Sequence, residues 1–77
     1  MQEKTLDKLA VGQTGRVKSL SAQGPLRRRL FDMGITQGAQ VYLRKTAPLG
    51  DPLEITVRGY ELTLRKSEAA YVVVEVN

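Results

Sequence analysis

The chain has 77 residues, a formal net charge of +4, and neither cysteine nor histidine. This length allows one domain over residues 1–77 with a small core, and the missing cysteines exclude disulfides and thiolate metal sites. Without histidine or cysteine, the usual nucleophile and base pairs of enzymes and the usual transition-metal ligands are also missing. The composition therefore favours a non-enzymatic binding module with no metal or cofactor.

No stretch of the chain predicts a membrane span or an export signal. The longest apolar run, residues 69–74, is much shorter than the roughly 20 residues that cross a bilayer. Residues 1–8 contain no apolar signal segment. We therefore expect a cytoplasmic protein that does not insert into a membrane.

The first strand is predicted at residues 15–20. Alternation there places Val17 and Ser19 inward, and Arg16 and Lys18 outward.

A short helix is predicted at residues 25–33, because Leu26, Leu30 and Met33 recur at i, i+4 and i+7 and share one face. Pro25 suits the first helical position, where its missing N–H has no intrahelical partner. Gly34 suits the left-handed residue of a Schellman-type end. A helix of this length is marginal alone in water, so its apolar face must dock on the strands.

A second strand is predicted from about Val41 to Thr46, after a turn in which Gly38 supplies a positive φ. Prolines then end the strand, since they remove ladder donors, and a loop follows. We expect Gly50 at position i+2 of a type II turn in this loop, with Leu49 at the tip.

Residues 53–58 and 60–65 are two similar alternating runs joined through Arg58 and Gly59. A two-residue hairpin loop at this point pairs Val57 with Tyr60, Ile55 with Leu62, and Leu53 with Leu64, all facing the core. A tight turn capped by Ser67 and a closing strand at residues 71–76 complete the chain.

Five short strands and one short helix inserted after the first strand predict an all-β (mainly β) fold, a small closed SH3-like barrel. An OB-like barrel is the competing architecture, although its helix usually comes later in the chain.

Three segments resemble, in order and spacing, the FeoA family of bacterial ferrous iron transport proteins: residues 28–35 with Gly38, residues 47–52, and residues 62–69. The resemblance implies a cytoplasmic, non-enzymatic SH3-like domain that docks on FeoB, a membrane Fe(II) transporter with a cytosolic GTP-binding domain, and supports iron uptake. It also implies kinship with the regulatory C-terminal domain of iron-dependent repressors, which is one alternative function.

Two segments are candidate partner-binding surfaces. The first is the proline-stiffened loop, because an exposed leucine on a rigid turn loses little entropy on binding; its residues are Pro48, Leu49, Gly50, Asp51 and Pro52. The alternative is a turn whose Leu49 covers the barrel rim.

The second surface is the helix, with Arg27, Arg28 and Phe31. Phe31 and Leu49 together could form an apolar patch for a partner or for weak homodimerisation.

Arg27, Arg28 and Arg29 suggest an arginine finger acting on a GTPase. Consecutive helical residues point about 100° apart, however, so a solvated helix face with an Arg28–Asp32 pair is the favoured interpretation.

A second alternative function is nucleic-acid binding by basic strand faces. The residues concerned are Arg16, Lys18, Arg44, Lys45, Arg58 and Arg65. Interleaved aromatic residues for base stacking are missing, so nucleic acid is the less favoured partner.

Overall fold

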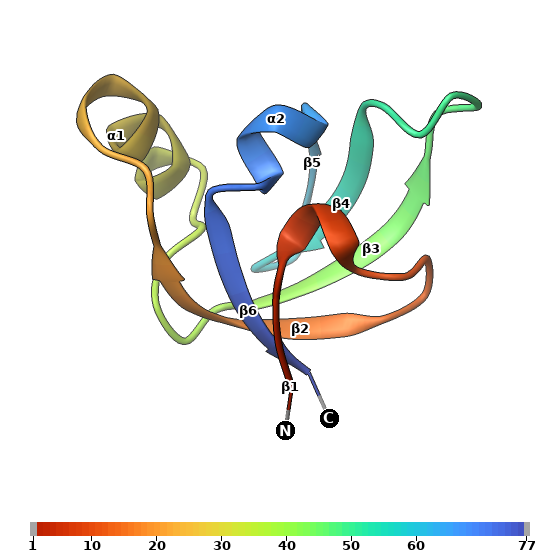
Figure 1. The fold of residues 1–77 in the computed structure, drawn as a ribbon, viewed down its shortest axis with the longest axis horizontal. Coiled ribbons are helices and arrows are strands. Elements are labelled where there is room, and N and C mark those ends of the chain that lie inside the picture. Colours follow the sequence, from red (N-terminus) through yellow and green to blue (C-terminus); the bar gives the residue numbers. More distant parts are fainter. Residues whose placement is uncertain (1, 77) are drawn as a thin grey trace.

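The computed structural model describes residues 2–76, which form six strands, two α-helices and one 3-10 turn (Figure 1). The strands are β1 (Gln2–Thr5), β2 (Thr14–Leu20), β3 (Gln40–Thr46), β4 (Leu53–Val57), β5 (Tyr60–Leu64) and β6 (Val72–Val76). The helical elements are η1 (Leu6–Lys8), α1 (Gly24–Asp32) and α2 (Lys66–Ala69). The prediction of a mainly β protein with a short helix is confirmed.

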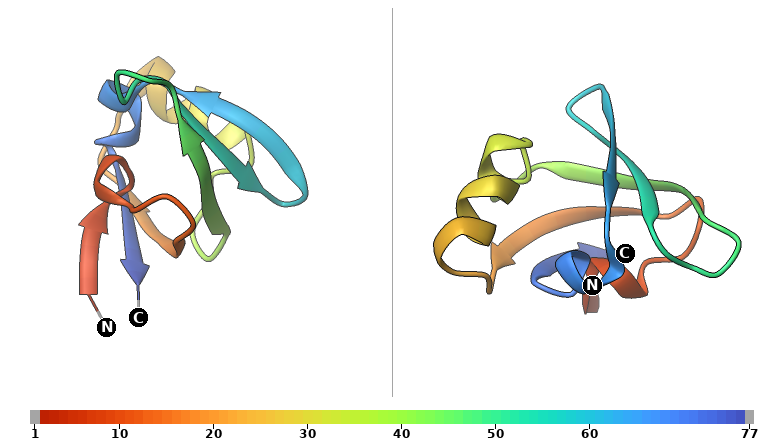
Figure 2. Two further views of the ribbon diagram at one scale, coloured as in Figure 1. Left: turned by 90° about the vertical axis from the view of Figure 1, so that its right-hand side faces the viewer. Right: turned by 90° about the horizontal axis from the view of Figure 1, so that it is seen from above.

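The six strands belong to one antiparallel sheet in the order β1-β6-β2-β3-β4-β5. The sheet curls on itself (Figure 2), but β1 and β5 are edge strands, so the closed five-stranded barrel is a wrong prediction in strand number and closure. The unpredicted strand β1 is polar and forms because its backbone pairs with β6, from Gln2 opposite Val76 to Thr5 opposite Val73. Because β1 precedes the strand that was predicted to be first, α1 follows the second strand, whereas the sequence predicted the helix after the first strand.

The core fills the inside of the curl. Its fully buried side chains include Leu6, Val17, Leu30, Ile35, Val41, Ile55, Leu64, Val72 and Val74. The alternation predicted for the strand at Val41 and Leu43 is confirmed by burial. On β2 a bulge between Val17 and Ser19 changes the register with β6, so Ser19 is exposed where the sequence predicted it inward.

The β4–β5 hairpin has the predicted register, with Val57 opposite Tyr60, Ile55 opposite Leu62, and Leu53 opposite Leu64. Arg58 and Gly59 both have positive φ, 51° and 82°, as a type I′ turn requires. Tyr60 is 72% exposed, so its assignment to the core is wrong. It lies at the tip of an edge strand, where fewer elements can cover it.

Helix α1 begins at Gly24, one residue before the predicted start, and Pro25 lies in its first turn. Leu30 is fully buried, while Leu26 and Met33 are partly buried against the core. The predicted apolar face therefore docks α1 on the sheet.

The end of α1 has the predicted Schellman geometry. The Gly34 N–H donates to Phe31 O at 2.9 Å, and the Ile35 N–H donates to Leu30 O at 3.0 Å. Gly34 and Gly38 have φ of 90° and 91°, so both are in the left-handed region that favours glycine.

Candidate partner-binding surfaces

The tip of the 47–52 loop is a tight turn closed by a 2.7 Å hydrogen bond from the Gly50 N–H to Ala47 O. This bond places Pro48 at i+1, Leu49 at i+2 and Gly50 at i+3, so the predicted position of Gly50 at i+2 is wrong. Leu49 is 97% exposed and does not cover the rim of the sheet.

The base of the same loop is tied to the body of the protein. The Ala47 N–H donates to Pro52 O at 3.0 Å, and the carboxylate of Asp51 accepts the Lys66 N–H at 2.8 Å. Asp51 thereby satisfies a free N–H at the start of α2, the role that the sequence assigned to Ser67. Asp51 is therefore a structural residue of the loop, whatever else it contacts.

The outer face of α1 carries the second set of predicted residues. The Arg27 guanidinium donates to Leu20 O at 3.2 Å and lies over the Phe31 ring, 5.1 Å from its centroid. Phe31 is 44% exposed. Within residues 2–76, Arg28 forms no ion pair, so the predicted Arg28–Asp32 pair is wrong.

The two predicted surfaces are separate. Helix α1 lies at one end of the long axis of the molecule and the 47–52 loop at the other, with α2 between them (Figures 1 and 2). Phe31 and Leu49 therefore do not form one apolar patch.

An open pocket of about 510 Å³ lies between α1 and the loop. Its lining residues are Arg29, Asp51, Pro52, Thr63, Arg65 and Glu68. The buried carboxylate of Glu68 accepts a bond from Arg29 Nη1 at 2.5 Å and another from the Arg65 N–H at 3.0 Å. Arg29 was predicted as a candidate arginine finger or, in the favoured interpretation, as a solvated helix residue; Arg65 and Glu68 were not predicted at this site. The one local sequence signal for the Arg65 N–H bond was the position of Glu68 three residues after Arg65, where a glutamate side chain can accept the N–H of the N-cap residue, as in half of a capping box.

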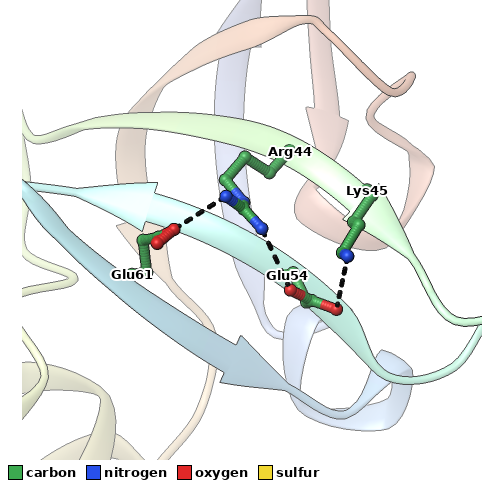
Figure 3. A network of polar contacts seen from close by, with 4 residues as sticks. All are labelled: Arg44, Lys45, Glu54 and Glu61. Carbon is green, nitrogen blue, oxygen red and sulfur yellow. Dashed lines mark hydrogen bonds and ion pairs between the residues drawn. The ribbon is translucent and has the colours of Figure 1, made fainter.

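Several basic residues of the strand faces have partners within the protein. Arg44 is paired with Glu61 at 2.8 Å and with Glu54 at 3.5 Å, while Lys45 Nζ lies 3.9 Å from Glu54 Oε2; Figure 3 shows the arrangement of these four side chains. The Arg58 guanidinium donates to Gly34 O at 3.1 Å and to Thr36 Oγ1 at 2.6 Å. The basic faces therefore offer a nucleic acid fewer free cations than the sequence suggested.

Lys18 on β2 is bonded to Glu3 on β1, across β6. The hydrogen bond with Glu3, and then the attraction of its charge, raise the pKa of Lys18 above its ordinary 10.5. Because the pKa is higher in the folded state, the stabilisation is present at neutral pH and is lost as the pH rises through the Lys18 pKa. We expect Glu3→Gln to lower this pKa in an NMR titration of Lys18 Nζ, and Glu61→Gln to leave it unchanged. An unaltered pKa in Glu3→Gln would contradict the pairing.

In residues 2–76, no group of three or more acidic, histidine or cysteine side chains is arranged to hold a metal ion. None of the helices described is long and apolar enough to cross a membrane.

The curled sheet, the short docked helix and the exposed, tied loop together define a small SH3-like domain. A family model described as the FeoA domain matches residues 4–76, and the chain therefore belongs to the FeoA domain family, which comprises accessory, non-enzymatic domains.

Three relatives show how close this kinship is. The chain is 30% identical over 71 residues to the Fe(2+) transport protein A/Fe(2+) transporter FeoB fusion protein of Porphyromonas gingivalis; the match covers 92% of the chain but only 8% of that protein's length. The FeoA-like protein of Clostridium acetobutylicum has a TM-score of 0.91 at 37% identity, over 99% of this chain and 88% of that one. Stenotrophomonas maltophilia FeoA, solved with zinc and described as a procaryotic SH3 domain protein, has a TM-score of 0.82 at 33% identity, over 92% and 88% of the two chains.

Proposed function

We propose that this chain is a cytoplasmic, non-enzymatic accessory protein of bacterial Fe(II) uptake, which docks on the cytosolic GTP-binding part of a FeoB-type transporter. Membership of the FeoA domain family supports this role. A relative that carries Fe(2+) transport protein A and FeoB in one polypeptide supports the choice of partner. In this proposal residues 1–77 act as one FeoA-like domain, and iron is the cargo of the transporter.

The exposure of Leu49 is the observation that most favours docking through the 47–52 loop. Leu49 is 97% exposed on a turn that is closed at its tip and tied to α2 at its base. An apolar side chain held on a rigid turn is ordered before binding, so covering it gains hydrophobic free energy at little entropic cost. Pro48 and Gly50 shape the turn, and Asp51 and Pro52 hold its base.

We expect Leu49→Ala to weaken binding to the cytosolic GTP-binding part of FeoB about tenfold, which is about 1.4 kcal/mol. Isothermal titration calorimetry with the two purified proteins measures the affinity. Val11→Ala is the matched control, because Val11 is an apolar residue 61% exposed on another loop, and it should bind like the wild type. Equal affinities for Leu49→Ala and wild type would remove the loop from the interface.

The outer face of α1 is a second proposed contact. The Arg27 guanidinium is already engaged with Leu20 and Phe31, whereas Arg28 is free of ion pairs within the described chain. An acidic partner surface would therefore pair with Arg28 and cover Phe31. GTP hydrolysis by FeoB, measured with wild type and with Arg28→Ala, tests an arginine finger; no stimulation beyond a control protein would exclude it.

The alternative functions have weaker support. Lys18, Arg44 and Lys45 are paired with glutamates, which disfavours a nucleic-acid surface. A regulatory role like that of the repressor domains would require contacts with a DNA-reading domain. Light scattering over a concentration series measures any weak homodimer.

A further inference from the structure

The free edge of β5 faces α1 across a groove. β5 is the last strand of the sheet, so only β4 pairs with it. The pocket of about 510 Å³ borders Thr63 and Arg65 on one side and Arg29 on the other. A second pocket of about 410 Å³ borders β5 with Tyr60, Glu61 and Leu62, and the end of α1 with Asp32 and the C-cap residue Met33. The two pockets lie end to end, because Arg29 and Met33 share a helix face and residues 60–65 are consecutive. We call this space the α1–β5 groove, and Figure 2 shows the edge of β5 turned toward α1.

The β5 backbone offers unpaired hydrogen-bonding groups to this groove. The Tyr60 N–H points to Val57 in the type I′ turn, so Tyr60, Leu62 and Leu64 direct their backbone groups to β4. Pairing alternates along an antiparallel ladder, and Glu61 and Thr63 therefore direct their N–H and C=O groups outward. In the described chain no other element pairs with these groups. They can bond to an added strand.

The side chains of the groove differ from one end to the other. At the α2 end, Asp51 and Glu68 already accept bonds from within the protein, whereas the Arg65 side chain makes none in residues 2–76. The centre is apolar, with Met33 and Leu62 half-buried. At the other end Asp32, which forms no ion pair within the described residues, borders the same pocket as the cation Arg58, which donates to Gly34 O and Thr36 Oγ1. The groove therefore presents a free cation at the α2 end and an apolar stretch beyond it.

We infer that the α1–β5 groove binds an extended peptide segment of the partner protein as a seventh, antiparallel strand. This inference rests on the proposed function and specifies the segment that docks. An antiparallel peptide places its N-terminal part beside Arg65 and its C-terminal part beside Asp32. Complementarity then requires an acidic residue first and apolar residues after it.

A second copy of this chain fits the groove less well than a single peptide. Strands in a sheet are about 4.8 Å apart, and the β5 strand of a second copy would bring its own β4 along the opposite side. Helix α1 occupies that side of the groove (Figure 2). A lone extended segment needs only the width of one strand.

The test uses the full chain and the cytosolic GTP-binding part of FeoB as the probe. Arg65→Glu reverses the charge at the cationic end of the groove. Thr63→Pro removes the N–H that points away from β4 and leaves the bonds between β5 and β4 in place, since proline is tolerated where an edge N–H faces away from the sheet. Both should weaken binding at least tenfold. Arg16→Glu is the charge-matched control at an exposed position of β2, and its affinity should stay within twofold of the wild type. In wild type, amide exchange at Glu61 and Thr63 should slow at least tenfold when the probe binds.

Each outcome decides the inference. Loss of affinity in both variants with slowed exchange at Glu61 and Thr63 supports it. Binding by wild type without slowed exchange at these amides overturns it and leaves the proposed function standing, even if Thr63→Pro fails to fold. No binding by wild type overturns both. If exchange at these amides slows with increasing concentration of this chain, without the probe, then a second copy occupies the groove, and the inference that a partner peptide binds there is overturned.

Discussion

Leu30→Ala is expected to lower the free energy of unfolding by about 2–5 kcal/mol, the largest loss of any change considered for this protein. Leu30 is the fully buried residue of α1, and its side chain belongs to the hydrophobic core. The change leaves a cavity under a helix of nine residues, which is too short to persist without its docking contacts. For a domain of this size, total stability is roughly 4–12 kcal/mol, so much of it would be lost.

Urea denaturation followed by circular dichroism measures this effect. Leu26→Ala is the matched control, because Leu26 lies on the same helix face but is only partly buried, and it should cost clearly less. A larger loss in Leu26→Ala than in Leu30→Ala would mean that α1 docks through its first turn.

Glu68→Ala is expected to lower the free energy of unfolding by about 1–3 kcal/mol. Glu68 is a buried carboxylate, and it connects α1 to α2 by accepting bonds from Arg29 and from the Arg65 N–H. Its removal leaves the Arg65 N–H at the start of α2 without a partner, whereas the half-exposed Arg29 can turn to water.

The same denaturation experiment includes two comparisons. Glu68→Gln keeps an acceptor for the Arg65 N–H and should lose less stability than Glu68→Ala. Glu54→Ala breaks ion pairs of a half-buried glutamate at the sheet surface and should cost less than about 1 kcal/mol. An equal loss of unfolding free energy in Glu54→Ala and Glu68→Ala would show that the burial of the Glu68 carboxylate contributes nothing to stability.

Local pattern was sufficient to predict the elements whose residues carry the signal themselves. The β4–β5 register follows from strict alternation around Arg58 and Gly59, and the end of α1 follows from Gly34 and the spacing of its leucines. In these segments propensity, pattern and turn chemistry agree.

The errors lie where distant segments decide the local structure. β1 has no apolar alternation and forms only because β6 offers an edge. The start of α2 is capped by Asp51, which lies 15 positions from Lys66, and Glu68 is paired with Arg29 across 39 positions. The pocket between the 47–52 loop and α1 also depends on contacts between distant segments. The sequence therefore predicted residues of the loop and the helix as candidate partner-binding residues but did not predict the pocket.

The pairing of Gln2 with Val76 places both ends of the described chain together, on the side opposite α1, α2 and the 47–52 loop (Figure 1). A covalent tether at either end would therefore leave the loop tip and the α1–β5 groove uncovered. With a short flexible tether, the local concentration of the domain near its partner reaches the millimolar range, so even a weak contact would be mostly occupied. Geometry of this kind permits the domain to work equally as a separate chain or as one segment of a much longer one.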